Sequence, residues 1–393
     1  MSDDRGPLSG VRIVDLSENM AGPFATMVLG DQGADVVKVE SLRGDQIRRT
    51  GSGTGGMAAY FANLNRSKRS LALDLLAPRG REVLDRLVDG ADVVVHAYRP
   101  QAAKKLRIDE PSIRTPGRPR LVYCEIVGFG PTGPLAGRAV YDHVVQALSG
   151  FAALQSDPVT GVPSLLRQGM IDKSTGLVAA QAITAALLRR SRTGLGESFQ
   201  VTMLDVALNV LWPDGMMNHT AAEVEYVRPP AANTYRLTPT ADGHLSMMVL
   251  TDAQWAALHP ALGLAPPGRR THPEILREAR ECLASMSTSD AIRALTAHDI
   301  PCAPVVALEA VPEHPQVVAN GSLAVFDHPV LGPIRQPLPA PHLGGMATAD
   351  LRPAPRLGEH SVEILREAGL DDAAIAELLE RGIVKVPEGS EGG

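Results

Sequence analysis

One aspartate stands where a helical pattern begins. Residues 172–194 form the longest such pattern: Asp172 lies at its start, the body is rich in Ala, arginines occupy 189, 190 and 192, and Gly194 follows. Acid at the start, base at the end and a following glycine are typical of a helix. The Asp172 carboxylate could serve only as an N-cap or first-turn acid, which stabilises a helix by about 1 kcal/mol. Alternatively, a carboxylate that the helix N-terminus keeps ionised and fixed in direction could attack an activated acyl group. The residues alone leave both interpretations open.

Basic residues gather near two expected strands. Those before the strand 71–73 and after the strand 91–96 are Arg66, Lys68, Arg69, Arg99, Lys104, Lys105 and Arg107. In open α/β sheets, ligands collect at the carboxyl ends of strands, where such cations could bind phosphate groups. Charged side chains are more often simply exposed to water. From the charges alone we favour solvated side chains, with phosphate binding as the alternative.

Other catalytic motifs are absent or weak. GFGPTG at 128–133 matches the G-x-G-x-x-G pattern and follows a strand, but Pro131 and Pro134 make it a poor helix opening, so we interpret it as a turn-rich loop. The chain has no P-loop, no G-x-S-x-G and no H-E-x-x-H motif, and its 11 histidines are dispersed. Its three cysteines show no C-x-x-C spacing. We therefore expect neither a metal site nor a disulfide framework.

Composition bears on partners and location. The 393 residues include 38 Lys and Arg against 44 Asp and Glu, a net charge of −6, and only 4% are aromatic. Nucleic-acid binders are usually basic with interleaved aromatic residues, so we expect no nucleic-acid partner. The first ten residues are acidic and polar, unlike a secretory signal, and no apolar run approaches the length of a membrane span. We expect a cytoplasmic protein without a membrane partner.

The elements that must position these residues alternate between strands and helices. Buried strands are predicted at 11–16, 34–40, 91–96 and 119–127, with helices at 21–30 and 78–87. Such alternation predicts an α/β fold with a parallel sheet and right-handed crossovers. Beyond residue 225 the pattern changes to short helices around a strand. We therefore predict a large α/β domain over 1–220 and a smaller α+β domain over 225–330.

A series of short motifs runs in order through nearly the whole chain. They are LSGVRIVDL at 8–16, AGP at 21–23, LGDQGADVVKVE at 29–40, GD at 44–45, NRSKRS at 65–70, LD at 73–74, ADVVV at 91–95, GFG at 128–130, GP at 133–134, YD at 141–142, Asp172, RTG at 192–194, TADG at 240–243 and APRLG at 354–358. Each motif alone is weak, but the ordered series is specific. The chain resembles the family III (CaiB/BaiF-type) CoA-transferases, the group that contains formyl-CoA transferase, carnitine CoA-transferase and the related α-methylacyl-CoA racemases.

The resemblance implies an architecture. The large domain would be Rossmann-like, the segment 331–393 would return to it, and two chains would form an interlocked homodimer in which each is a ring threaded by the other. The substrates would be coenzyme A and acyl-CoA, with no metal. CoA would contact Met20, Ala21, Leu73, Ala97, Arg99, Lys105, Arg138, Tyr141 and Asp142.

The resemblance also implies a mechanism, because the family's nucleophilic aspartate falls on Asp172. The enzyme would be a transferase of sulfur-containing groups that moves CoA from an acyl-CoA donor to a carboxylic acid. The route would run through an aspartyl anhydride and an aspartyl-CoA thioester. Backbone N–H groups near Met20 and Ala21, and a glycine loop of the small domain, would stabilise the tetrahedral intermediates.

One position separates CoA transfer from racemisation. The racemases of this family carry a His immediately before the aspartate that aligns with Asp142, where it acts as a proton-transfer base. This chain has Tyr141 there. Because the ordinary pKa of tyrosine is about 10, Tyr141 is a poor base at neutral pH. A transferase is therefore preferred over an acyl-CoA racemase or epimerase, which stays as an alternative.

Other positions depart from the formyl-CoA transferases. Those enzymes have Arg, Lys and Gln where this chain has Ser41, Leu76 and Met20, and their glycine run is reduced to Asp and Gly at 242–243. The CoA phosphates would instead meet Arg99, Lys105 and Arg138. The departures argue against formyl-CoA and oxalate as substrates and leave the donor and acceptor acids open. They also keep a catalytically degenerate CoA-binding paralogue as a further alternative.

Overall fold

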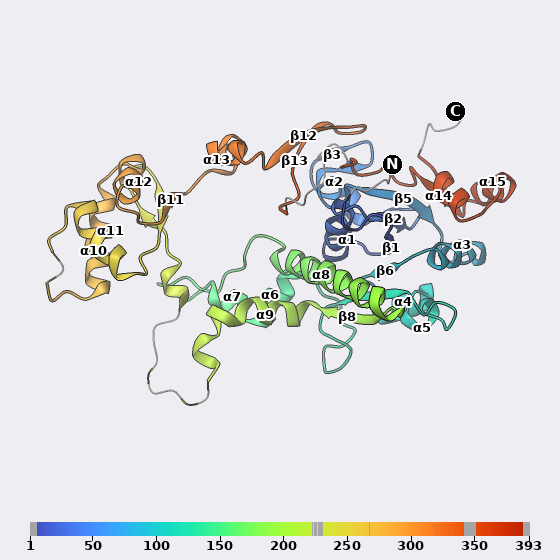
Figure 1. The fold of residues 1–393 in the computed structure, drawn as a ribbon, viewed down its shortest axis with the longest axis horizontal. Coiled ribbons are helices and arrows are strands. Elements are labelled where there is room, and N and C mark those ends of the chain that lie inside the picture. Colours follow the sequence, from blue (N-terminus) through green and yellow to red (C-terminus); the bar gives the residue numbers. More distant parts are fainter. Residues whose placement is uncertain are drawn as a thin grey trace. The chain divides into compact units, whose positions relative to one another are not determined.

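A computed structural model describes residues 6–221, 223, 226, 231–266, 268–341 and 351–387 (Figure 1). The chain forms two compact units. One combines residues 1–211 with residues 321–393, and the other comprises residues 212–320. The site residues expected from the sequence all lie in the first unit, so the second is described only briefly.

A seven-stranded sheet forms the centre of the first unit. The order of its strands is β14-β5-β2-β1-β6-β7-β8. All of them run parallel except β14, which pairs antiparallel to β5 at one edge. The strands are β1 (Arg12–Asp15), β2 (Asp35–Glu40), β5 (Lys68–Leu73), β6 (Val93–His96), β7 (Val122–Val127), β8 (Ser198–Thr202) and β14 (Val384–Lys385). The expected α/β class with a parallel sheet is confirmed.

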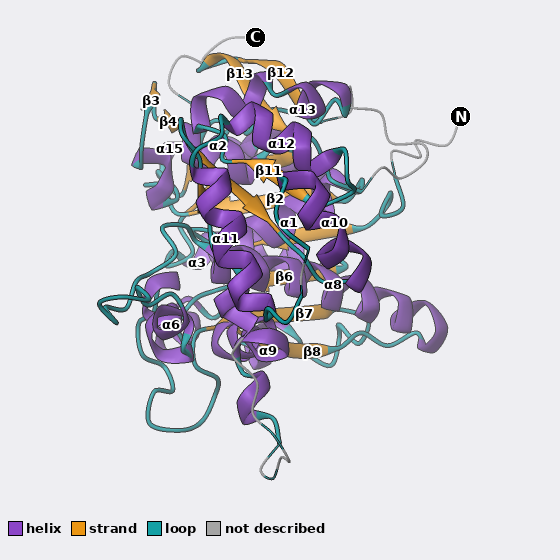
Figure 2. Ribbon diagram, turned by 90° about the vertical axis from the view of Figure 1, so that its left-hand side faces the viewer, coloured by secondary structure: helices purple, strands orange, loops and turns teal. Residues whose placement is uncertain are grey.

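The order of the parallel strands marks one place in the sheet as special. The chain first adds β2 and β5 on one side of β1, and then β6, β7 and β8 on the other side. Figure 2 shows β2, β6, β7 and β8 in this order across the sheet, and β1 pairs between β2 and β6. Sheets wound in both directions in this way bind ligands outside the carboxyl ends of the two strands where the order reverses. Here those strands are β1 and β6.

Helices cover both faces of this sheet. One buried core is shared by α1 (Ala21–Asp31), α8 (Met170–Thr193) and α9 (Met203–Gly215). The opposite core is shared by α3 (Pro78–Asp89), α4 (Pro100–Leu106), α5 (Glu110–Ile113), α14 (Ser361–Glu367) and α15 (Asp372–Glu380). Both cores consist mainly of Val, Leu, Ile and Ala, which explains how a chain with few aromatic residues fills its interior.

A glycine lets α8 lie directly against α1. A Cβ atom on Gly176 would stand 2.7 Å from the carbonyl oxygen of Ala21, closer than a real carbon atom can approach. The side chains of Ala25, Ala179 and Ala180 on these two helices are also small and buried. The first turns of α1 and α8 therefore come to lie side by side.

The remaining elements are short. The first unit also contains β3 (Gly53–Thr54), β4 (Met57–Ala58), α2 (Ala59–Asn65), α6 (Asp142–Ser149), α7 (Phe151–Leu154), β12 (Leu323–His328) and β13 (Gly332–Pro337). The second unit has an antiparallel sheet of β9 (Thr238–Pro239), β10 (His244–Met247) and β11 (Cys302–Pro304), with α10 (Asp252–Leu262), α11 (His272–Ala284), α12 (Thr288–Thr296) and α13 (Pro315–Ala319). Within the described ranges, none of the helices is both long and apolar enough to cross a membrane.

The basic residues around the start of β5 lie in buried ion pairs. Arg66 lies 2.6 Å from Asp31, Lys68 lies 3.0 Å from Asp15, and Arg69 bonds three carboxylates. The three cations are at most 5% exposed. The interpretation of these side chains as solvated was therefore wrong, because tertiary packing brings carboxylates from distant parts of the chain around them. Their charges are already neutralised within the protein.

Candidate active site

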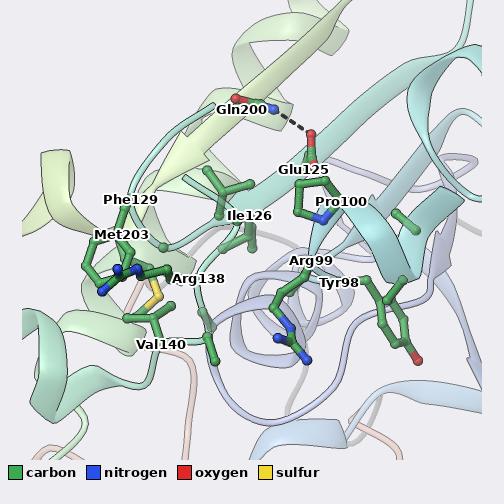
Figure 3. Close-up of a pocket in the computed structure, with 18 of the residues that line it drawn as sticks. Tyr98, Arg99, Pro100, Glu125, Ile126, Phe129, Arg138, Val140, Gln200 and Met203 are labelled. Atoms are coloured by element: carbon green, nitrogen blue, oxygen red, sulfur yellow. Dashed lines mark hydrogen bonds between the residues drawn. The ribbon is translucent and has the colours of Figure 1, made fainter. Parts of the chain in front are cut away.

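A pocket of about 790 Å³ lies at the carboxyl ends of β1, β6 and β7 (Figure 3). Its wall includes the segments that follow these strands, at 18–21, 97–100 and 128–131, together with residues 137–141. The pocket thus spans the place where the strand order reverses, which is where doubly wound sheets bind their ligands. GFGPTG at 128–133 is a loop here, as its prolines indicated.

Asp172 lines this pocket from the first turn of α8. The N-cap of α8 is Gly169, so Asp172 is the third residue of the helix and a first-turn acid, not its cap. The backbone N–H of Asp172 donates a 2.9 Å hydrogen bond to the Asp142 carboxylate at the start of α6. The Gln146 amide donates to the other oxygen of that carboxylate. The buried Asp142 therefore ties the start of α8 to α6 and fixes the position of Asp172.

Two opposing effects act on the charge of Asp172, because its helix position favours the ionised form and its burial favours the neutral form. Burial raises the pKa of its carboxyl to about 7, the Asp142 carboxylate adds to the rise, and Lys173 opposes it only in part. From the ordinary value of 3.8, this rise corresponds to about 4 kcal/mol. A helix N-terminus stabilises an anion by about 0.3–1 kcal/mol, which is too little to prevent it. A carboxylate that stays ionised was one of the two interpretations open from the sequence, and burial works against it. At neutral pH, the neutral and ionised forms are about equally populated.

Backbone N–H groups lie in the same wall. Met20 is the N-cap of α1, and the N–H groups at a helix start have no acceptor within the helix. Within the part of the chain that the structure describes, no oxygen accepts from the N–H of Met20 or Ala21. The Met20 side chain crosses the start of α8, since a Cβ atom on Gly169 would stand 2.7 Å from its sulfur. These donors and Asp172 thus belong to one wall.

Three cations line the pocket without an internal counter-ion. Arg99, Lys104 and Arg138 form no salt bridge with any described residue. Figure 3 shows Arg99 and Arg138 in different parts of the wall, at a distance from Glu125. They contrast with the buried, paired cations of β5. Arg99, Lys104 and Arg138 are therefore the positive charges with which an anionic ligand of this pocket can pair.

Hydrogen-bond donors shield two of the four acidic side chains that line the pocket besides Asp172; the four are Glu18, Asp109, Glu110 and Glu125. The Tyr98 hydroxyl donates a 3.0 Å hydrogen bond to Glu18, and the Gln200 amide donates a 2.6 Å bond to Glu125. Burial raises the pKa of both Glu18 and Glu125 above the ordinary value. Their negative charge is therefore easier to neutralise when an anion enters.

The structure brings most of the expected site residues together. Those that line the pocket are Met20, Ala21, Ala97, Arg99, Arg138, Tyr141 and Asp172. Asp142 lies buried behind Asp172, and Leu73 is 0% exposed at the end of β5. Lys105 is exposed on α4 and is not part of the wall, which includes its neighbour Lys104. The glycine contact expected from the small domain near Gly243 stays a prediction.

Several wall residues were not expected from the sequence. Glu18, Asn19, Tyr98, Phe129 and Gln200 were not singled out, although they line the pocket. Most follow a predicted strand directly, so the rule that ligands meet the carboxyl ends of strands could have identified them. Among the described residues, no group of three or more His, Cys, Asp or Glu is placed to hold a metal ion.

Comparison with curated proteins gives a consistent result. The Agrobacterium fabrum protein named succinate–glutarate CoA-transferase is 34% identical over 93% of this chain and 97% of its own length. Human succinyl-CoA:glutarate CoA-transferase is 33% identical, over 96% of this chain and 90% of its own. A formyl-CoA:oxalate CoA-transferase of Rhodopseudomonas palustris is 30% identical, over 97% and 98%.

Solved structures and a family model agree. A CaiB/BaiF family protein from Brucella suis matches with a TM-score of 0.78 at 29% identity, over 93% of this chain and all of that one. Rv3272 from Mycobacterium tuberculosis matches with a TM-score of 0.79 at 28% identity, over 91% and 99%. The sequence model of CoA-transferase family III matches residues 8–361. The resemblance seen in the sequence motifs is thus confirmed, and this chain belongs to CoA-transferase family III.

Proposed function

We propose that this protein moves CoA from an acyl-CoA donor to a carboxylic acid, with Asp172 as the nucleophile. One observation carries the proposal: Asp172 lines the same pocket as Met20 and Ala21, whose N–H groups have no acceptor among the described residues, and as three cations with no counter-ion among them. A nucleophile, donors for an oxyanion and charges for an anionic cofactor are the parts that such a transfer needs.

The first half of the reaction loads the enzyme with CoA. An Asp172 carboxylate oxygen attacks the thioester carbonyl carbon of the donor, the carbon–sulfur bond breaks, and CoA leaves as a thiolate. The product is a mixed anhydride between Asp172 and the donor acid. The thiolate then attacks Cγ of Asp172, which releases the donor acid as a carboxylate. An aspartyl-CoA thioester remains, and no charge has been gained or lost.

The second half repeats these steps with the acceptor acid. The acceptor carboxylate attacks Cγ of the aspartyl thioester, which gives a new mixed anhydride and again frees the CoA thiolate. The thiolate attacks the acceptor's carbonyl carbon, and Asp172 leaves as a carboxylate. One thioester has replaced another, so the exchange is nearly thermoneutral. Splitting the transfer into two displacements lowers each barrier.

The rise in the pKa of Asp172 supports this role. A carboxylate taken out of water is a stronger base, and therefore a stronger nucleophile, than an exposed one. With a pKa of about 7, a large share of the side chain is still ionised at neutral pH. In each tetrahedral intermediate, the N–H groups of Met20 and Ala21 would stabilise the developing oxyanion.

The cations of the wall would bind the phosphates of CoA. Arg99 and Arg138 were expected in this role, and Lys104 joins them because it also lines the pocket. Leu73 and Lys105 stay as predicted contacts. The relatives named above act on succinyl-CoA, glutarate, formyl-CoA and oxalate. We propose acyl-CoA thioesters and free carboxylic acids as the substrate classes, with succinyl-CoA and glutarate as the first pair to assay.

Two copies of the chain would form the enzyme, interlocked as in the family. Exposed apolar side chains on α6 and α8 support an association, and they are Val144, Leu148, Leu177, Val178 and Leu188. Sedimentation should give twice the chain mass of 41.6 kDa. Tagged and untagged dimers, once mixed, should exchange subunits only after unfolding, because interlocked rings cannot separate while folded. A monomer, or free exchange, would reject the interlocked dimer.

Mass spectrometry of the trapped enzyme tests the mechanism. After incubation with an acyl-CoA donor, hydroxylamine should convert Asp172 to a hydroxamate, and Asp172→Ala should lose both the adduct and CoA exchange. Asp205→Ala, at the exposed third position of α9, is the matched control. A fully active Asp172→Ala enzyme would end the proposal. Deuterium exchange at the α-carbon without an acceptor acid would favour the racemase, and tight CoA binding without turnover would favour the degenerate paralogue.

A further inference from the structure

The turn between β1 and α1 holds an unusual backbone conformation inside the pocket wall. Residues 18–21 all line the pocket, and Asn19 among them has a φ of 68°. This left-handed conformation is uncommon for any residue except glycine, although asparagine tolerates it better than most. Because Asn19 directly precedes Met20, its φ and ψ angles set the direction of the N–H groups that follow.

Two buried charged residues form hydrogen bonds with the backbone of this turn. Asp45 accepts a 3.3 Å hydrogen bond from the N–H of Asn19. Lys38, on β2, donates a 2.8 Å bond to the carbonyl oxygen of Ser17 and lies 3.1 Å from the other oxygen of Asp45. Lys38 and Asp45 together therefore link Ser17 and Asn19, the residues on either side of Glu18. The side chains of Lys38 and Asp45 are 0% exposed.

A second buried pair fixes the start of the same turn. Asp15 accepts hydrogen bonds from the N–H of Ser17 at 2.9 Å, from the Thr26 hydroxyl at 2.6 Å and from Lys68 at 3.0 Å. Asp15 is 0% exposed and Lys68 is 1% exposed. Ion pairs so deeply buried often stabilise a fold no better than apolar residues of the same size would. Because both pairs form hydrogen bonds with the backbone of one turn of the pocket wall, we expect them to orient that turn.

We propose that Lys38 and Asp45 are positioning residues, which hold Asn19 in its left-handed conformation so that the N–H groups of Met20 and Ala21 face the reacting carbonyl. The proposal rests on the function proposed above, because it assumes that these N–H groups stabilise an oxyanion there. Neither residue lines the pocket, so both would act on the reaction only through the backbone of the turn. Loss of one correctly placed oxyanion donor typically slows a reaction about 100-fold or more.

A pair of variants at Asn19 tests the backbone conformation without removing a buried charge. Asn19→Val disfavours a φ of 68°, whereas Asn19→Gly adopts it freely. We expect Asn19→Val to slow formation of the Asp172 adduct about 10- to 100-fold, with the Kd of CoA changed less than about threefold. Asn19→Gly should form the adduct at least about threefold faster than Asn19→Val, because glycine restores the backbone conformation. Asp299→Val is the control for strain, because Asp299 also has a left-handed φ, of 59°, but lies in the second unit.

A second set of variants tests the buried pair. Asp45→Asn keeps the oxygen that accepts from Asn19 and should slow adduct formation less than Lys38→Met, which loses the bonds to both Ser17 and Asp45. If Lys38→Met does not fold, the Asn19 variants still test the inference. Two results would overturn the inference and leave the proposed function standing. One is an equal adduct rate for Asn19→Val and the wild type, and the other is an Asn19→Gly enzyme that is as slow as Asn19→Val. Absence of any adduct in the wild-type enzyme would instead reject the proposed function.

Discussion

Replacing Asp172 by asparagine is expected to make the folded protein more stable while abolishing catalysis. The pKa of Asp172 is about 7 in the folded protein and 3.8 in the unfolded reference. Above pH 7 the folded protein must therefore keep a carboxylate charged where burial disfavours it. Linkage converts the difference into about 4 kcal/mol of lost stability at pH 8, which is an upper value because the pocket admits some water.

The sign and the pH range follow from the direction of the change. Below pH 3.8 the group is protonated in both states, so it costs no stability. Between 3.8 and about 7 the unfolded chain loses the proton while the folded chain retains it, and stability falls as the pH rises. Above 7 the full cost is present. The advantage of Asp172→Asn over the wild type should therefore grow by about 2–3 kcal/mol between pH 5 and pH 8.

Urea unfolding followed by circular dichroism at pH 5, 6, 7 and 8 measures this difference. The matched control is Asp205→Asn, since Asp205 is also the third residue of its helix but is exposed. That change should alter the free energy of unfolding by about 0.5 kcal/mol or less at each pH. An advantage of Asp172→Asn that does not change with pH, or a loss of stability at pH 8, would refute the reasoning that burial raises the pKa of Asp172.

Three further predictions concern the rate, the affinity for CoA and the helix contact. Adduct formation should rise about tenfold per pH unit below pH 7 and level off above it, with the midpoint at lower pH in Asp142→Asn; a pH-independent rate would contradict this. Arg138→Ala should weaken CoA binding roughly tenfold by calorimetry, whereas Arg366→Ala on the exposed part of α14 should not; equal affinities would remove Arg138 from the phosphate site. Gly176→Ala should destabilise the fold by about 1–3 kcal/mol in urea, since its Cβ would stand 2.7 Å from a backbone oxygen, and a neutral effect would show that α1 and α8 can separate.

Much of the large unit could be predicted from the sequence because its strands are fully buried. In β6 (Val93–His96) three valines follow one another, so the strand type is set locally, and β6 lies within the predicted 91–96. The strand expected at 119–127 begins only at Val122, since the three residues before it are Pro, Arg and Leu in a connecting loop. The helix expected from Asp172 begins at Met170. Ends of elements depend on neighbouring loops, which periodicity does not describe.

The surroundings of the charged side chains could not be predicted from the sequence. The basic run that contains Arg66 and Lys68 looks in the sequence like an exposed cluster. Both side chains are nevertheless buried against aspartates that lie 35 and 53 positions away in the chain. The partner of each cation depends on which strands are neighbours in the sheet, and local patterns carry no such information. For the same reason Lys38 and Asp45 were given no role from the sequence beyond their place in two motifs, although both are buried.

By itself the sequence determined the alternation of strands and helices, the family through an ordered series of motifs, and the place of Asp172 near the start of a helix. These depend on residues that are near one another in the chain. Only the tertiary structure decided the charge state of Asp172, since burial and Asp142 raise its pKa to about 7. It also decided the left-handed turn at Asn19 and the choice between paired and unpaired cations. Desolvation and ion pairing depend on distances in space, which exist only once the sheet and helices have packed together.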